Sequence, residues 1–252
     1  MKVNRIDNTI CKLYNVRYTD CFYHDRTNIV SILGFFNEIA QEAGFYYDRE
    51  KNILKEESLA WIILNWDIQI NRYPKYRERV KACTIARSID RFVAFREFQL
   101  FDQNDQMLAR GKSKWILLNL EKRKPAIARD YMFQLYGVNE TTTPFTINKP
   151  LEYKEKGDGA FLFRVRKRDV DDYEHVNNTI YAYWINESVP DEVTDTMTLE
   201  NLRVYYKRET IYPNDVFIHN KILEKGHILH RVDQADGKNL VYAESFWRGK
   251  NV

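Results

Sequence analysis

The chain has 252 residues, of which 44% are hydrophobic and 30% charged, with a mean hydropathy of −0.58. It contains no apolar stretch of membrane-spanning length, and a net charge of +3 does not suggest a nucleic-acid-binding protein. Three cysteines (Cys11, Cys21, Cys83) are too few and too scattered to predict a disulfide framework or a zinc site. With no signal-peptide or transit pattern at the amino terminus, we expect a cytoplasmic protein. The glycines form no dinucleotide or P-loop signature.

An amphipathic helix and an alternating strand are predicted in the first half of the chain. Apolar residues recur at helical spacing from Ile29 to Ala43, with Thr27 or Asn28 as the N-cap and Gly44 as the end. Apolar and polar residues alternate over 62–70, which predicts a strand with one buried face. Residues 137–160 are rich in Thr, Pro, Gly and charge without periodicity, and we interpret them as a linker.

The second half predicts the same order of elements. A strand over 161–165 is followed by a helix from about 178 to 189, with Asn177 or Asn178 as cap and Pro190 as stop. Further strands are predicted around 216–218 and 228–232. One helix followed by several antiparallel strands, given twice, indicates a duplicated α+β unit.

Shared residues support this duplication. Identities recur at a constant spacing of 149 positions: Val16/Val165, Arg17/Arg166, Asp20/Asp169, Asn28/Asn177, Asn37/Asn186 and Glu38/Glu187. A second echo pairs 102–105 with 233–236, at a spacing of 131. Each copy of this echo precedes a strand-like run with a bulky aromatic residue, Trp115 in one and Phe246 in the other.

Polar residues gather directly before the predicted helix of the second copy, in the run from Asp169 to Asn178. Helix amino termini expose unpaired N–H groups and favour negative charge, so such a place can stabilise a developing oxyanion. His175 lies close enough in sequence to orient or polarise a reactant there. The first copy has Arg26 at this position, so the chemistry is predicted to belong to the second copy. The alternative is that His175 only serves the loop.

The pattern Asp-x-Asp-x-x-x-His-Val-Asn-Asn-x-x-Tyr, followed by Trp184, Glu187 and a Tyr-Lys-Arg-Glu run ending at Glu209, resembles the acyl-ACP thioesterase family. The resemblance covers about residues 12–248. It implies an α+β fold of two tandem hotdog domains, each a curved antiparallel sheet wrapped around a central helix. We expect an N-terminal domain over 1–136 with the acyl-chain pocket, a linker over 137–160 and a C-terminal catalytic domain over 161–252.

The resemblance also implies roles for individual residues. Asp171 and His175 match the family's catalytic aspartate and histidine, and Glu209 matches the acidic residue of its Tyr-x-x-Glu segment. Tyr173 stands where many plant members have Asn, and Thr210 where many have Cys, so a cysteine nucleophile is not expected. Residues expected to line the site or its oxyanion region are Tyr173, Asn177, Asn178, Thr179 and Thr210.

The expected reaction is hydrolysis of a fatty acyl-ACP thioester to a free acid and ACP, without metal or organic cofactor. Glu209 would take a proton from water, His175 would position the water or the carbonyl, and Asp171 would fix the site through hydrogen bonds. Glu209 could instead pair with Lys207. The open alternatives are an acyl-CoA thioesterase and a non-catalytic acyl-binding or regulatory hotdog protein, which Tyr173 keeps possible. No metal triad is predicted at His219, His227 or His230, which have no carboxylate at ligand spacing in the sequence.

The expected partners are an acyl carrier protein and, as the resemblance implies, a second copy of the chain in a homodimer. No nucleic acid and no membrane span are expected. Basic residues are dense from Arg72 to Arg91, with seven basic residues against two acidic ones, and again around 110–124 and 164–168. These runs are either solvated faces or a docking surface for an acidic carrier.

Overall fold

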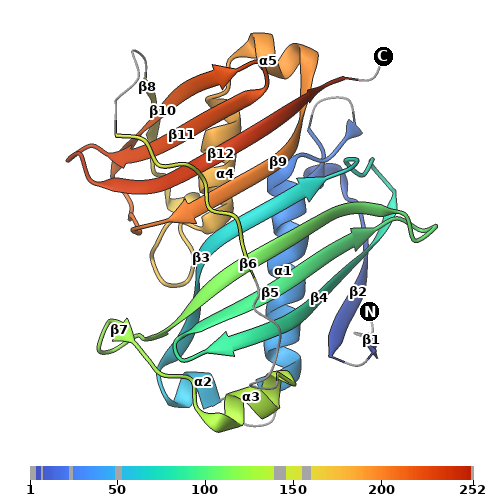
Figure 1. Cartoon of the computed structure of the whole chain (residues 1–252), viewed down its shortest axis with the longest axis vertical. Coiled ribbons are helices and arrows are strands. Elements are labelled where there is room, and N and C mark those ends of the chain that lie inside the picture. Colours follow the sequence, from blue (N-terminus) through green and yellow to red (C-terminus); the bar gives the residue numbers. More distant parts are fainter. Residues whose placement is uncertain are drawn as a thin grey trace. The chain divides into compact units, whose positions relative to one another are not determined.

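The computed structural model describes residues 4–6, 8–22, 25–48, 53–138, 146–154 and 160–250 (Figure 1). It forms two compact units. Unit 1 comprises Met1–Trp66 and Asn71–Ile147, and unit 2 comprises Asp67–Ile70 and Asn148–Val252. The division after Ile147 falls inside the expected linker. None of the helices in the described ranges combines the length and apolar character of a membrane span.

Unit 1 is an antiparallel sheet with one long helix, α1 (Ile29–Asp48), along it (Figure 1). The strand order is β1 (Asn4–Ile6), β2 (Thr9–Asn15), β4 (Arg79–Asp90), β5 (Val93–Phe101), β6 (Met107–Asn119) and β3 (Leu59–Ile70), and β7 (Lys124–Pro125) pairs with β6. The short helices are η1 (Tyr18–Asp20), α2 (Ile53–Glu56) and α3 (Asp130–Tyr136).

Helix α1 forms because its apolar stripe is buried and its first turn is capped. Asn28 Oδ1 accepts hydrogen bonds from the N–H groups of Val30 and Ser31, at 2.9 and 3.2 Å. The helix continues past Gly44 to Asp48, so the predicted end was wrong. The last turn continues because it has somewhere to pack: the Tyr47 ring lies edge-on to a ring of α3 and joins a second apolar cluster. Tertiary packing therefore outweighs the glycine.

Unit 2 has the same plan around helix α4 (Asn178–Glu187), which buries Tyr181, Ala182, Trp184 and Ile185. Asn177 caps this helix through its side chain, which accepts from the Thr179 N–H at 3.0 Å. The strand order is β9 (Met197–Tyr206), β12 (Asn239–Gly249), β11 (His227–Gln234), β10 (Asp215–Glu224) and β8 (Ala160–Arg164). The other helices are η3 (Lys167–Asp169) and α5 (Asp191–Thr196).

The two units repeat the same local hydrogen bonds, so the predicted duplication is visible in the structure. In η1 the Arg17 N–H donates to the Asp20 carboxylate at 2.8 Å, and in η3 Arg166 and Asp169 do the same at 2.8 Å. The later echo is corrected by one residue. The indole of Trp115 donates to Ser113 Oγ, and the matching indole is that of Trp247, on Ser245 Oγ. The spacing there is 132 positions rather than 131, and Phe246 is not the counterpart of Trp115.

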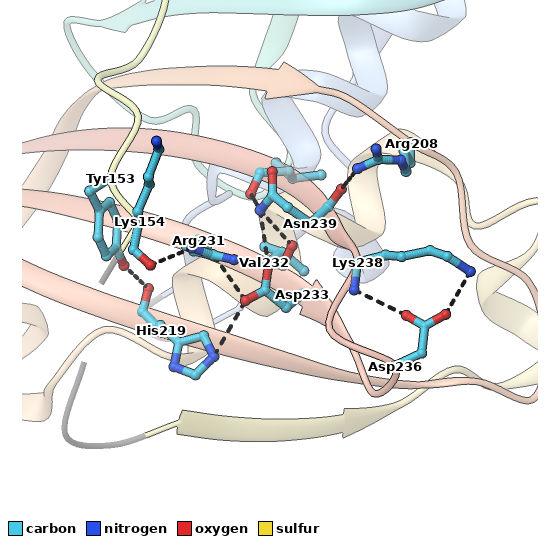
Figure 2. Close-up of polar contacts among 11 residues, drawn as sticks. Tyr153, Lys154, Arg208, His219, Arg231, Val232, Asp233, Asp236, Lys238 and Asn239 are labelled. Carbon is cyan, nitrogen blue, oxygen red and sulfur yellow. Dashed lines mark hydrogen bonds and ion pairs between the residues drawn. The ribbon is translucent and has the colours of Figure 1, made fainter. Parts of the chain in front are cut away.

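The described part of the expected linker is packed rather than free. Gly137 ends α3 in the left-handed conformation. Farther along, the Tyr153 hydroxyl donates to the His219 carbonyl at 2.6 Å, and Arg231 donates to the Lys154 carbonyl at 2.7 Å (Figure 2). Asp233 holds the same guanidinium. Tyr153 and Lys154 are thus hydrogen-bonded to strands of unit 2. Residues 139–145 and 155–159 of the expected linker lie outside the described residues.

Two of the three cysteines are joined, contrary to the expectation from sequence. Cys11 on β2 and Cys83 on β4 form a disulfide, with their Cα atoms 4.1 Å apart. They are 72 residues apart in sequence, and the antiparallel register of the two strands places them directly opposite each other. Spacing along the chain could not reveal this pairing. Cys21 is a free thiol.

Candidate active site

The loop that carries His175 is closed on itself by Asp171. The Asp171 N–H donates to the His175 carbonyl at 2.8 Å, and Asp171 Oδ1 accepts from the N–H groups of Tyr173 and His175 at 2.9 and 3.4 Å. Glu174 adopts a positive φ of 62°, which this turn requires. Asp171 therefore fixes the backbone around His175.

The imidazole of His175 contacts the carboxylate of Glu209. His175 Nε2 lies 3.2 Å from Glu209 Oε2, and the two side chains are 26% and 45% exposed. The loops that carry them are joined, because the Val176 N–H donates to the Thr210 carbonyl at 2.9 Å. The residue before Glu209 is also anchored: Arg208 donates to the Asn239 carbonyl at 3.0 Å (Figure 2). The pair is thus held from both sides yet reachable from solvent.

Two amides expected in the oxyanion region are already occupied. The Asn177 N–H donates to the Asp169 carbonyl at 2.9 Å, and the Thr179 N–H donates to Asn177 Oδ1 at 3.0 Å. Either group would have to give up its bond to serve an oxyanion, which corrects the expectation for these two positions. Asn178 contributes its carbonyl, which accepts from the Tyr206 hydroxyl at 3.0 Å.

The two positions that depart from the family pattern differ in exposure. Tyr173 is 54% exposed beside the site. Thr210 is 2% exposed, and its hydroxyl donates to Gln234 at 2.9 Å and accepts from Asn214 at 3.1 Å. Thr210 therefore supports the Glu209 loop from inside rather than lining the site, contrary to the expectation.

Tyr181, on the inner face of α4, is a neighbour of the site that sequence reasoning did not assign. Burial raises the pKa of its hydroxyl well above the usual range, and the charges of Glu209 and Asp171 raise this pKa further, whereas a contact with the Thr210 backbone lowers it. At the spacing of 149 the first copy has Ile32. A tyrosine replacing isoleucine on an otherwise apolar helix face was the signal available in the sequence.

Unit 1 forms the same scaffold without the same chemistry. The Thr27 N–H donates to the Pro74 carbonyl at 2.9 Å, as the Val176 N–H does to Thr210 in unit 2. This match places Arg26 at the position of His175 and Tyr73 at the position of Glu209. Among the residues that the structure describes, the imidazole–carboxylate pair therefore belongs to unit 2.

Two other histidines have carboxylate partners that the sequence spacing did not reveal. His227 Nε2 lies 2.8 Å from Glu244, and His219 Nε2 lies 3.7 Å from Asp233. Strand pairing brings these groups together across neighbouring strands. Within the described ranges, no group of three His, Cys, Asp or Glu side chains is arranged to hold a metal ion.

His230 is the centre of a buried, uncharged chain of hydrogen bonds. Its Nε2 lies 2.7 Å from Ser245 Oγ and its Nδ1 2.7 Å from Asn220 Oδ1. Asn220 Oδ1 can only accept, so the ring proton lies on Nδ1, and Nε2 accepts from the Ser245 hydroxyl, whose oxygen accepts from the Trp247 indole. Asn220 Nδ2 then donates to Ser188, just after α4. Burial lowers the pKa of His230 to about 3, so the ring is neutral.

Removing either helix cap should cost stability, but only one cap adjoins the candidate site. Asn177→Ala and Asn28→Ala should each lower the free energy of unfolding by about 1 kcal/mol, because each removes a side-chain acceptor from a helix amino terminus. Asn177→Ala should also lower kcat/KM, since its helix begins beside His175. Chemical denaturation and steady-state kinetics of both variants measure this. An equal loss of activity in Asn28→Ala would contradict the link between this cap and the site.

Comparison with known proteins matches the fold and the motif to one family. The model of the acyl-ACP thioesterase N-terminal domain matches residues 7–136, and that of the C-terminal domain matches 153–249. An oleoyl-acyl carrier protein thioesterase of Coriandrum sativum is 30% identical over 183 residues, 68% of this chain and 50% of the relative. An acyl-[acyl-carrier-protein] hydrolase of Cuphea viscosissima is 26% identical over 248 residues, 90% of this chain and 60% of the relative. The chain thus spans about half the length of the curated relatives it matches.

Solved structures agree on the fold. The 12:0-ACP thioesterase of Umbellularia californica superposes with a TM-score of 0.84 at 19% identity, over 98% of this chain and 100% of that one. An acyl-ACP thioesterase of Bacteroides thetaiotaomicron gives 0.81 at 14% identity, over 96% and 98%. These matches confirm the predicted α+β fold with hotdog domains. The chain belongs to the acyl-ACP thioesterase family.

Proposed function

We propose that this protein hydrolyses fatty acyl-ACP thioesters, releasing a free fatty acid and ACP, and that unit 2 carries the chemistry. The observation that carries the proposal is the 3.2 Å contact between His175 Nε2 and Glu209 Oε2, in a loop that matches the family motif. Both side chains are partly exposed, so a substrate can reach them. The acyl-ACP substrate is supported by the family and by the names of the relatives.

In the proposed reaction, Glu209 removes a proton from a water molecule as its oxygen attacks the thioester carbonyl carbon. The C–S bond then breaks, and the proton passes to the leaving thiolate, so that acid and thiol are the products. His175 positions the water or the carbonyl, with Glu209 orienting its ring. Asp171 is a positioning residue that holds the His175 loop. A general base contributes about 10²–10⁴-fold to such a step.

Water is the proposed nucleophile for two reasons. Thr210, which follows Glu209, is buried and its hydroxyl is engaged by two side chains. All three cysteines belong to unit 1, and Cys11 and Cys83 are joined to each other. The proposed reaction requires neither a metal ion nor an organic cofactor.

The test is an assay of the purified chain on acyl-ACPs of increasing chain length, with the released acids measured by mass spectrometry. We expect turnover, and we expect kcat/KM to be higher than on acyl-CoA of the same chain length. Higher kcat/KM on acyl-CoA would favour the acyl-CoA thioesterase. Binding of acyl-ACP without release of acid would contradict the proposal and favour an acyl-binding role.

The homodimer and the cytoplasmic location stay predictions. Edge strand β8 offers a surface that a second copy could cover, because Phe161 and Leu162 are 46% and 59% exposed there. Sedimentation velocity measures the oligomeric state, and cell fractionation measures the location.

A further inference from the structure

The most distinctive charge around the candidate site lies in the turn that leads into it. Arg164 at the end of β8 and Lys167 and Arg168 in η3 are exposed, and we call these three residues the basic turn. The turn is tied to the His175 loop, because the Asp169 carbonyl accepts from the Asn177 N–H at 2.9 Å. Lys167 also lies 5.9 Å from the Tyr212 ring, on the loop that carries Glu209. The basic turn therefore borders both loops of the site.

The duplicated unit shows that these cations are not needed to build the turn. Unit 1 forms the same short helix with the same arginine–aspartate bond, so Arg166 and Asp169 belong to the scaffold. At the spacing of 149, however, unit 1 has Asn15, Tyr18 and Thr19 at the positions of the basic turn. Tyr18 lies edge-on to Tyr76 at 5.9 Å, where unit 2 places Lys167 against Tyr212. The cations therefore occur in the unit that has the imidazole–carboxylate pair and are absent from the unit that has the same fold without this pair.

The positive charges of the basic turn are only weakly neutralised by carboxylates of the protein itself, so they are available to a binding partner. Arg164 pairs with Asp215 at 3.4 Å, and Arg168 lies 4.0 Å from Asp169 while 78% exposed. The Arg164–Asp215 pair lies on the surface and contributes little, whereas the buried carboxylate of Asp169 is held by Arg166. The denser run of unit 1 differs, because several of its cations have close carboxylate partners: Arg72 with Glu78, Lys81 with Asp105 and Arg87 with Glu97. In that run, pairing leaves fewer cations available to a partner than the sequence density indicates.

We propose that the basic turn, with the exposed side chains of Ile211 and Tyr212 beside it, is the docking surface for the acidic carrier protein. This inference rests on the proposed function and adds the place where the partner binds. Cations bordering the site attract an acidic partner and favour a productive orientation. Asp172 and Glu174 on the His175 loop are exposed and would repel the same partner, so the carrier approaches from the η3 side.

The test compares two double charge reversals in unit 2. Lys167→Glu with Arg168→Glu should lower kcat/KM on acyl-ACP about tenfold at low salt, since electrostatic steering supplies 10- to 10³-fold. It should also flatten the fall of kcat/KM with added salt. Lys225→Glu with Lys250→Glu is the matched control. It makes the same charge change just after β10 and β12, at the ends of these strands that face away from the Glu209 loop, and it should have little effect on kcat/KM. Each variant is also assayed on an uncharged acyl thioester of N-acetylcysteamine, which neither reversal should affect.

The outcomes separate the docking surface from the proposed function. Absence of hydrolysis of both thioesters by the wild-type chain overturns the function itself. Wild-type kcat/KM on acyl-ACP in the Lys167/Arg168 variant, or an equal loss in the control, overturns the docking surface alone. An equal loss on acyl-CoA also overturns it, because the contact would then be to a phosphate of the substrate arm rather than to the carrier protein.

Discussion

Glu209→Gln should lower kcat/KM on acyl-ACP by about 10²–10⁴-fold, the contribution of a general base. The amide has the shape of the carboxylate and still offers an oxygen to His175 Nε2, but it cannot take a proton from water. The free energy of unfolding should hardly change, because Glu209 is 45% exposed and a surface ion pair contributes about 0–1 kcal/mol. Steady-state kinetics and chemical denaturation of the same preparation measure both effects.

Glu224→Gln is the matched control for this substitution. Glu224 is an exposed carboxylate in the same unit, at the end of β10 far from the Glu209 loop, and its substitution should leave kcat/KM unchanged. Near wild-type turnover by Glu209→Gln would show that another group accepts the proton. A matching loss of kcat/KM and of stability would show that Glu209 holds the loop rather than performing the chemistry.

The second large effect concerns stability in acid and arises from His230. Its pKa is about 3 in the folded protein and about 6.5 in the unfolded chain, so only the unfolded chain takes up a proton between these values. Above about pH 6.5 His230 is neutral in both states and does not change the free energy of unfolding. As the pH falls below about 6.5, protonation of the unfolded chain lowers the free energy of unfolding. From this group alone, the free energy of unfolding should fall by about 1.4 kcal/mol for each pH unit below about 6.

His230→Gln tests this because glutamine has a donor and an acceptor but does not titrate. Denaturation at pH 7.0, 6.0 and 5.0 should show a shallower loss of stability in the variant than in the wild type, whatever the absolute stability of each. Other titrating groups are common to both proteins and cancel in the comparison. The ring NMR signals of His230 should stay those of the neutral Nδ1–H form down to pH 5. Titration of this ring near pH 6 would contradict the buried network.

Much of the fold could be predicted because it depends on local sequence patterns that occur in both copies of the duplicated unit. The apolar stripe of α1 and the capping side chains of Asn28 and Asn177 can be recognised from the amino-acid sequence alone. The disulfide of Cys11 and Cys83 and the carboxylate partners of His219 and His227 were not, because strand register decides which distant residues meet. The end of α1 was mispredicted for a similar reason, since the packing of Tyr47 lies outside any local pattern.

For the candidate site, the motif indicated His175 and Glu209, and folding brings their side chains into contact. The motif could not show which acceptor each backbone N–H bonds with. The N–H groups of Asn177 and Thr179 were therefore expected to be available, although a turn and a helix cap already bond them. Thr210 was expected beside the substrate for the same reason. Thr210 points inward because its hydroxyl bonds with Gln234 and Asn214 within the loop.

The boundary of unit 2 limits how members of this family could be recombined. The last four residues of β3, Asp67–Ile70, belong to unit 2, where Asn148 and Asn201 donate to the Asp67 carboxylate at 2.8 and 3.0 Å. A chimera joined between 137 and 147 would take Asp67 from one parent and both amide partners from the other, whereas a junction between 149 and 160 would separate Asp67 from Asn201 alone. Exchanging carboxyl-terminal halves between relatives therefore requires these three positions to be inherited as a set, or a buried charge is left without its donors.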